Sequence, residues 1–292
     1  MDRLINILIP VLLVEMMAAI GLRVSFRDLG NIVKHGRLMF RTILANYLCV
    51  PAAAVALLLL VHAEPMIAIG FLILAVCPGA PFGPSCTALA RGNVPVAVGL
   101  MTFLAVSSAI AAPVLLHMLV PLVSGNDSLQ VDAVKIFRTL LVTQLLPLFV
   151  GLCIRQWLPR LADWLQKPAD KLTAILSLLT VCAILFVHFH LLMEIRLRGY
   201  MGMTVLLVAS WIAGWLLGGP EYGIRKTMAL TTALRNVGVG LVIATASFPG
   251  TAAVTASLAY GLFEILGCVL LALWWGRRAS SSTACHEIPT AS

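Results

Sequence analysis

Charge is scarce in this chain. Aspartate, glutamate, lysine and arginine make up 11% of its 292 residues, whereas 61% of the residues are hydrophobic. A soluble domain of this size is excluded by that composition, which instead predicts several apolar spans of about 20 residues each. Catalytic signatures are also missing, because the sequence has no GxSxG, HExxH or P-loop motif and no paired carboxylates. We therefore expect a membrane protein that is not an enzyme.

Metal-ligand spacing is absent as well. The chain has seven cysteines, but none forms a CxxC motif or a Cys/His ligand pattern. Six of them fall inside apolar runs, where small buried thiols are the expected state. These six are Cys49, Cys77, Cys86, Cys153, Cys182 and Cys268, and Cys285 lies near the end of the chain. We expect no disulfide, no bound metal and no cofactor.

Nine apolar segments alternate with short polar loops. They are residues 4–22, 38–61, 66–90, 95–121, 136–157, 171–193, 200–218, 226–247 and 252–275. The sequence thus predicts an all-α polytopic membrane domain over residues 1–276. The last residues, 277–292, contain few large apolar groups and are expected to form a disordered tail.

Basic residues are distributed unequally between the two sets of loops. The net charge of +8 is carried in short loops, which favours a membrane surface over a nucleic acid as its partner. The loops after spans 1, 3, 5 and 7, together with the tail, hold Arg23, Arg27, Lys34, Arg37, Arg41, Arg91, Arg155, Arg160, Lys167, Lys171, Arg225, Lys226, Arg277 and Arg278. The opposite side holds Arg3, Lys135, Arg138, Arg196 and Arg198. The excess predicts a plasma or inner membrane protein with its N-terminus outside and its C-terminus in the cytoplasm.

Span 3 is interrupted by a run of prolines and glycines, Cys77-Pro78-Gly79-Ala80-Pro81-Phe82-Gly83-Pro84-Ser85. Each proline removes a backbone donor and clashes with the preceding turn, so an α-helix cannot continue through this run. Non-helical backbone is tolerated at membrane depth only where it is buried in protein or lines a cavity. A broken membrane helix of this kind is typical of a transporter binding site.

A second interruption is predicted in span 8, where Arg235 and Asn236 stand beside Gly238 and Gly240 in an apolar context. Spans 3 and 8 are five spans apart, and an odd offset reverses the direction of crossing. We therefore expect inverted repeats at about residues 1–121 and 171–276, linked by the span at 136–157, with the two broken helices crossing.

Arg235 is the sharpest candidate for function. An arginine at the centre of a membrane span costs about 2.5–3.5 kcal/mol on insertion scales, so it is normally retained for a role inside the bundle. It either binds an anionic group of the substrate, replaces a coupling cation, or forms a structural ion pair. Glu15 and Glu264, also predicted within spans, are candidates to neutralise it or to carry a proton.

Other polar groups surround the breaks. The half-helix beginning near Pro84 and Ser85 presents N–H groups and a positive dipole end, which suit an anion. Ser85 and Thr87 add hydroxyl groups. Asn46 precedes Pro51 in span 2 and is expected to face the same cavity.

Three patches of the sequence resemble the bile acid:sodium symporter family of secondary transporters. The stretch from Ile20 to Asp28 is similar to the family's Met-Gly-Leu…Phe segment. Pro78 to Asn93 is similar to its Pro-Gly-Gly-x-x-Ser-Asn…Leu-Ala-x-Gly-Asp pattern, and Thr231 to Asn236 occupies the place of its Glu-x-Gly-x-Gln-Asn motif. The resemblance looks closest to nine-span members. It implies a core domain with two crossing broken helices and a panel domain that rocks against it.

The departures from this pattern concern the sodium ligands. The family's Ser-Asn pair falls on Gly83 and Pro84, its glutamate on Thr231 and its glutamine on Arg235, whereas Thr102 keeps one hydroxyl. Sodium needs several oxygen ligands, preferably with a carboxylate, so both family sites are expected to be lost. The candidate substrate-binding residues are Asn46, Gly83, Pro84, Ser85, Thr87, Thr102, Thr231, Thr232, Arg235 and Asn236.

The resulting hypothesis is a transporter of a small organic anion that is not driven by sodium, coupled to protons or acting as a uniporter. The first alternative is a conventional sodium symporter with rearranged ligands. A second is an arsenite-type exporter, because Pro84-Ser85-Cys86-Thr87-Ala88 resembles a motif of that related family. A third, from another class, is a membrane-embedded receptor or enzyme. The oligomeric state is left open.

Overall fold

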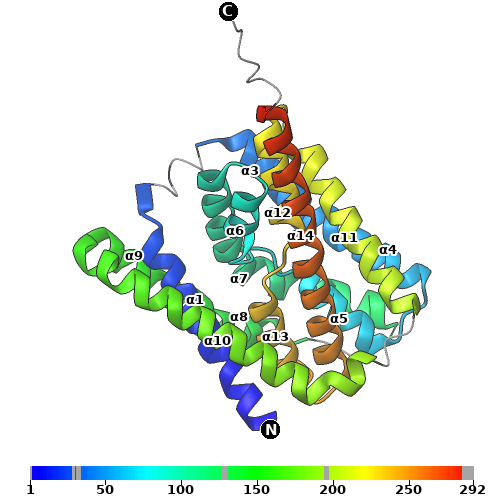
Figure 1. Ribbon diagram of the computed structural model, residues 1–292. Helices are drawn as coiled ribbons and strands as arrows, with labels where there is room; N and C mark the ends of the chain where they lie inside the picture. Colours follow the sequence, from blue (N-terminus) through cyan, green and yellow to red (C-terminus); the bar gives the residue numbers. More distant parts are fainter. Residues whose placement is uncertain (1, 28–29, 31–33, 126–130, 194–196, 285–292) are drawn as a thin grey trace, which may run out of the picture.

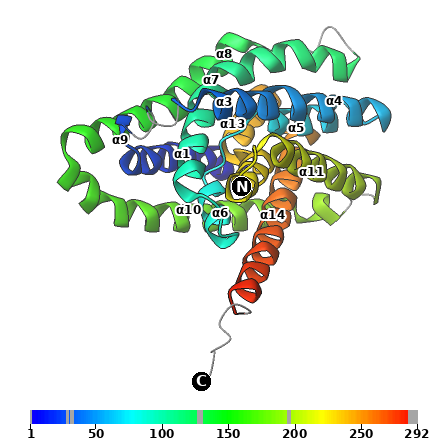
Figure 2. The same cartoon turned by 90° about the horizontal axis from the view of Figure 1, so that it is seen from above.

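Helices account for nearly all of the described chain in the computed structural model (Figures 1 and 2). The structure describes residues 2–27, 30, 34–125, 131–193 and 197–284. A chain in lipid must pair its own backbone groups, which a helix does within its own segment. The helices are α1 (Asp2–Arg23), α3 (Gly36–Ile43), η1 (Leu44–Cys49), α4 (Val50–Leu60), α5 (Pro65–Ala75), α6 (Gly83–Leu89), α7 (Val94–Ser124), α8 (Ala133–Leu140), η2 (Leu141–Leu145), α9 (Leu146–Trp157), α10 (Pro159–Met193), α11 (Leu197–Leu217), α12 (Tyr222–Ala233), α13 (Val237–Ser247) and α14 (Ala252–Ala284). The predicted all-α membrane fold is confirmed.

Within the described ranges, 5 helical segments are long and apolar enough to cross a membrane, judged by length and composition. They are Gly36–Leu60, Val94–Ser124, Ala133–Trp157, Leu197–Leu217 and Ala252–Arg278. The shorter apolar helices α5 and α13 belong to the two interrupted spans. Helices α1 and α10 cover the predicted spans 1 and 6 but are not among these 5 segments. The total of nine spans therefore stays a prediction.

Two of these segments widen into a π-helix just before a proline. The π-helix η1 leads into Val50-Pro51, and η2 leads into Leu146-Pro147. Proline has no N–H and its ring crowds the carbonyl of the preceding turn, so a wider turn relieves the clash. Each π-helix carries one fully buried side-chain amide, Asn46 in η1 and Gln144 in η2. The proline of span 2 thus lies beside the position from which Asn46 enters the interior.

Spans 3 and 8 are each broken into two helices. In span 3, α5 ends at Ala75 and α6 begins at Gly83. In span 8, α12 ends at Ala233 and α13 begins at Val237. Both interruptions lie where proline, glycine and charge in an apolar context predict them.

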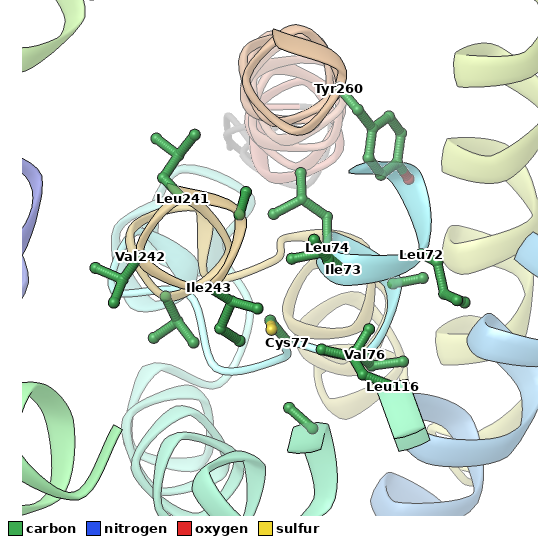
Figure 3. Packing of buried hydrophobic residues seen from close by; sticks show 14 of the residues in the cluster. Leu72, Ile73, Leu74, Val76, Cys77, Leu116, Leu241, Val242, Ile243 and Tyr260 are labelled. Atoms are coloured by element: carbon green, nitrogen blue, oxygen red, sulfur yellow. The ribbon is translucent and has the colours of Figure 1, made fainter. Parts of the chain in front are cut away.

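Apolar side chains from α5, α13 and α14 surround the interruptions. In Figure 3, Ile73 and Leu74 of α5 lie between α13 and the rest of the cluster, and Cys77 lies near the place where the two broken chains approach. On α14, the ring of Tyr260 stacks on Phe71 with 5.2 Å between the ring centroids. The non-helical backbone is therefore enclosed by protein.

Helices α1, α9 and α10 pack together, and α1 and α9 lie on the opposite side of the molecule from α4 and α11 in both views (Figures 1 and 2). We call α1, α9 and α10 the side layer, and α5–α7 with α12–α14 the crossing core. The α1 and α9 backbones touch: a Cβ added to Gly21 would lie 2.3 Å from the Leu148 carbonyl oxygen. A Cβ on Gly151 would lie 2.4 Å from the Ala18 oxygen. Small residues at such contacts allow close helix packing in membranes, which here ties α1 firmly to α9.

The C-terminal helix is longer than the sequence predicts. It continues past Trp275 and through Arg277 and Arg278 to Ala284. Helix α14 thus includes residues 277–284, and the expectation of a disordered tail stays a prediction. The rest of that tail, residues 285–292, lies outside the described residues.

Candidate functional site

The two interruptions meet and pair with each other. Pro78 and Arg235 form an isolated antiparallel bridge. The Asn236 backbone N–H donates to the Cys77 carbonyl oxygen at 2.8 Å, and Asn236 Nδ2 donates to the Gly79 oxygen at 3.3 Å. Backbone groups released from one broken helix are therefore satisfied by the other, as burial at membrane depth requires.

Two local features hold this geometry in place. Gly79 has φ +93°, a left-handed conformation, and a Cβ there would lie 2.6 Å from the Ala105 nitrogen of α7. Only glycine combines that φ with that space. At the other interruption, Asn236 Oδ1 accepts a bond from the Val239 N–H at 3.2 Å and so caps the start of α13.

Arg235 is fixed from two directions and is only 1% exposed. Its guanidinium Nη1 donates to Asn46 Oδ1 at 3.2 Å, and its backbone N–H donates to Glu264 Oε1 of α14 at 2.7 Å. Asn46 Nδ2 in turn donates to the Thr232 hydroxyl at 3.4 Å. The side chain thus contacts η1 while the main chain contacts α14. We call Asn46, Thr232, Arg235, Asn236 and Glu264 the crossing cluster.

The crossing cluster contains polar atoms that its internal bonds do not use. Arg235 Nε and Nη2 and Glu264 Oε2 are buried without a hydrogen-bond partner among the described residues, as is the nearby Tyr260 hydroxyl. Buried polar atoms of this kind are normally hydrogen-bonded. The cluster is therefore a buried polar site whose guanidinium and carboxylate are not directly paired within the described chain.

The three threonines singled out on spans 3, 4 and 8 occupy other positions. Thr231 Oγ1 donates to the Thr227 carbonyl at 2.8 Å, and Thr102 Oγ1 donates to the Val98 carbonyl at 2.9 Å, both within their own helices. The Thr87 hydroxyl is buried without a partner in the described chain. Two of these hydroxyls thus donate their protons to their own helices and retain only acceptor capacity.

A cavity of about 530 Å³ lies between the side layer and the crossing core. Helices α1 and α10 form one wall, and the first interruption with α6 and α7 forms the other; the positions of these helices are shown in Figure 1. The lining consists of Met16, Ala19, Ile20, Arg23, Val24, Pro81, Phe82, Pro84, Ser85, Val98, Met101, Asp170, Thr173, Ala174, Ser177 and Leu178. Its size and mostly apolar walls are those of a small-molecule site.

The structure separates residues that the sequence placed in one cavity. Pro84 and Ser85 line the cavity, whereas Asn46, Arg235 and Glu264 do not. Gly83, at the start of α6, is buried and faces Thr231, whose Cγ2 would lie 3.5 Å from an added Cβ. The candidates therefore fall into a buried cluster and an open cavity.

Glu15 lies outside the crossing cluster and contacts a residue that lines the cavity. Its Oε2 accepts a bond from Thr173 Oγ1 at 2.7 Å, and Thr173 itself lines the cavity. Its other oxygen, Oε1, is buried without a partner among the described residues, and so is the Ser177 hydroxyl. Of the two carboxylates considered for coupling, Glu15 is thus near the cavity and Glu264 is at the crossing.

Sequence reasoning missed the polar residues of α10 that reach the cavity. Arg23 was counted only for orientation, and Asp170, Thr173 and Ser177 were not considered. The structure pairs Arg23 with Asp170 across the α1–α10 contact. Asp170, Thr173 and Ser177 are spaced so that they share one face of α10. Only the tertiary fold shows that this face meets the face of α1 that carries Arg23.

Comparisons with known proteins agree with this architecture. Residues 10–197 match the profile of the sodium bile acid symporter family. An uncharacterized sodium-dependent transporter of Bacillus subtilis, YocS, is 25% identical over 287 residues, covering 94% of this chain and 85% of that protein. Probable chloroplastic sodium/metabolite cotransporters are also similar: BASS1 of Arabidopsis thaliana is 24% identical and BASS2 of rice is 23% identical. This chain spans 64% and 62% of those plant proteins, respectively.

Proposed function

The chain belongs to the sodium bile acid symporter family, and from this we propose that it carries a small organic anion across the membrane without the two sodium ions implied by the resemblance. It is a membrane transporter by family and by fold. The observation that carries the proposal is the position of the Arg235 guanidinium, which is buried at the crossing and bonded to Asn46.

The positions that the resemblance gives to the sodium ligands carry few oxygen atoms in this chain. Sodium needs several oxygen ligands converging on one point, preferably with a carboxylate. Thr231 stands where the resemblance puts a glutamate, so a single neutral hydroxyl oxygen replaces a carboxylate. Gly83 and Pro84 offer no side-chain oxygen. A guanidinium in the same cluster repels a second cation, and the buried setting leaves that repulsion poorly screened.

We infer that Arg235 acts in place of a coupling cation. Of the roles open to it from the sequence, substrate binding is disfavoured because Arg235 is 1% exposed and lies outside the cavity lining. The guanidinium instead offers a tethered positive charge to the Asn46 oxygen of span 2. In this proposal the crossing always carries the positive charge that a bound sodium ion would otherwise supply.

The substrate occupies the cavity between the side layer and the crossing core. Alternating access follows if the side layer rocks against the core and exposes the cavity to each side in turn. Two observations support a cytoplasmic opening: the cavity contains Arg23, one of the basic residues assigned to the inside, and α1 begins at the opposite end of the molecule from the end of α14 (Figure 1). An organic anion is preferred because the mostly apolar walls include the guanidinium of Arg23, whose exposed partner Asp170 an anionic ligand can replace.

A second candidate is a sodium symporter with rearranged ligands. It is favoured by the carboxylate of Glu264, which reaches the crossing from α14 and leaves Oε2 unpaired among the described residues. The names of the related proteins also refer to sodium. In that reading Glu264 replaces the carboxylate that Thr231 lacks.

The experiment that separates the two candidates is uptake into proteoliposomes. Labelled carboxylates, from pantoate to cholate, are offered with an inward gradient of either sodium or potassium chloride. The proposal expects the same initial rate in both salts. A rate that rises strongly with the sodium gradient contradicts it and supports the second candidate.

A further inference from the structure

The cavity contains one basic and one acidic side chain among its lining residues, Arg23 of α1 and Asp170 of α10. The remaining lining side chains are apolar or carry a neutral hydroxyl group. Among the described residues, an acidic group entering the cavity therefore meets Arg23 as its cationic partner. Arg235, the cation that stands out in the sequence, is enclosed in the crossing cluster.

Arg23 and Asp170 bind each other in the structure. The described contact joins one guanidinium nitrogen, Nη2, to one carboxylate oxygen, Oδ1. The two side chains are 48% and 38% exposed, respectively. Exposed ion pairs contribute little to stability because water screens them. A carboxylate supplied by a ligand can therefore replace Asp170 at small cost, and the planar guanidinium can accept it in a two-point arrangement.

The surrounding side chains define what else the ligand must carry. Met16, Ile20, Val98, Met101 and Leu178 provide an apolar lining. Such a surface favours a ligand with an apolar body. The hydroxyls of Thr173, Ser177 and Ser85 also line the cavity and suit a ligand with hydroxyl groups of its own. The chemistry of the cavity is that of an amphipathic monocarboxylate.

We propose that Arg23 binds the acidic group of the transported anion and that Asp170 stands in for that group when the cavity is empty. This inference rests on the proposed function, because it assigns a residue to the site through which the anion passes. Displacing Asp170 also releases a contact between α1 and α10 at the cavity. Substrate binding then changes how two helices of the side layer are held together.

The test measures binding to the purified full-length protein by isothermal titration. The probes are octanoate, pantoate and cholate, each compared with its uncharged amide. Arg23→Gln is expected to weaken binding of the acids by about tenfold or more, as the loss of a charge-assisted hydrogen bond does. Binding of the amides is expected to change little. Arg23→Lys keeps the charge without the planar fork and is expected to fall between the two.

The Asp170→Asn variant is expected to change the affinity for the acids in the opposite direction. It removes the competing carboxylate, so the acids are expected to bind about two- to fivefold more tightly, the range that an exposed ion pair represents. Arg155→Gln is the matched control, because Arg155 pairs with Asp163 in a second described ion pair outside the cavity lining. That variant is expected to bind the acids as the wild type does. Thermal unfolding of each variant verifies that it is folded.

The outcomes separate this inference from the proposed function. If an acid binds the wild type and Arg23→Gln binds it equally well, the role of Arg23 is contradicted while the proposed function stands. If Asp170→Asn weakens binding, Asp170 positions the ligand. That result contradicts the proposal that Asp170 takes the place of the ligand's acidic group in the empty cavity. If none of the acids binds the wild type more tightly than its amide, the organic-anion function fails, and this inference fails with it.

Discussion

At the scale of single residues, the unusual feature is an arginine at the centre of a membrane protein without a direct ion pair to its guanidinium among the described residues. Arg235 is held instead by Asn46 through the side chain and by Glu264 through the backbone N–H. A buried charge is costly unless it is compensated. The carboxylate of Glu264 therefore has two effects, since it accepts the unpaired N–H of the interruption and places a negative charge near Arg235.

The first prediction concerns Glu264. Glu264→Ala removes a buried charge-assisted hydrogen bond and leaves the Arg235 N–H unpaired, which is expected to lower the free energy of unfolding by about 2–3 kcal/mol. Glu264→Gln keeps an oxygen acceptor and is expected to lose about 1 kcal/mol. Thermal unfolding of the purified variants measures both. Equal losses for alanine and glutamine would show that the acceptor oxygen is not what matters.

The second prediction restores the residues that the family resemblance implies. In Thr231→Glu/Arg235→Gln the crossing regains a carboxylate and loses its fixed cation, so sodium is expected to raise the unfolding temperature above its value in potassium at equal ionic strength. Thr231→Glu alone keeps the guanidinium and serves as the control, with no sodium effect expected. A double variant indifferent to sodium contradicts the idea that Arg235 occupies the ion's place.

At the scale of elements, two broken helices exchange backbone hydrogen bonds where they cross. The bond from Asn236 to Cys77 and the bridge between Pro78 and Arg235 replace the bonds that each helix loses. The left-handed Gly79 lets the first chain turn directly against α7. The crossing is therefore specified by a few positions, of which Gly79 tolerates no side chain.

The third prediction tests that specification. Gly79→Ala places a Cβ 2.6 Å from the Ala105 nitrogen in a left-handed conformation, so it is expected to destabilise the protein by at least about 1–3 kcal/mol. The matched control is Gly202→Ala in α11, where an added Cβ meets nothing within 4 Å. A helical glycine replaced by alanine is expected to gain about 0.5–1 kcal/mol. Unfolding temperatures that shift equally in the two variants would contradict the constraint at Gly79.

The elements show what a single sequence can predict here. Prolines, glycines and a charge in an apolar run are local signals, so both interruptions were predicted at the correct residues. The partner of Arg235 was not, because Asn46 lies 189 residues earlier and the sequence offers Glu15 and Glu264 as equal candidates. The cavity wall formed by α10 was also missed, since the α1–α10 contact depends on tertiary packing. The end of α14 was misplaced because its last turns contain small polar residues that are typical of tails.

At the scale of the whole molecule, the side layer and the crossing core form opposite walls of the cavity. The close contact of α1 with α9 at Gly21 and Gly151 makes the side layer a unit that can move as one body. The crossing core is held by its own hydrogen bonds. Rocking of one against the other is the motion that this division favours.

The fourth prediction concerns the direction in which the cavity opens. Ser85 is exposed and lines the cavity, whereas Thr232 is fully buried in the crossing cluster. In a cysteine-free background, Ser85→Cys is expected to react with a membrane-impermeant thiol reagent in inside-out vesicles and much more slowly in right-side-out vesicles. Thr232→Cys is expected to be unreactive in both. Faster labelling of Ser85→Cys from the outside would contradict the cytoplasmic opening.

Sodium independence is the central claim, and equilibrium binding of radioactive sodium to the purified protein tests it most directly. The measurement compares the wild type with Thr231→Glu/Arg235→Gln, over a range of sodium concentrations at constant ionic strength. The account predicts no saturable sodium binding to the wild type and saturable binding to the double variant. Saturable, stoichiometric binding of sodium to the wild type would contradict it.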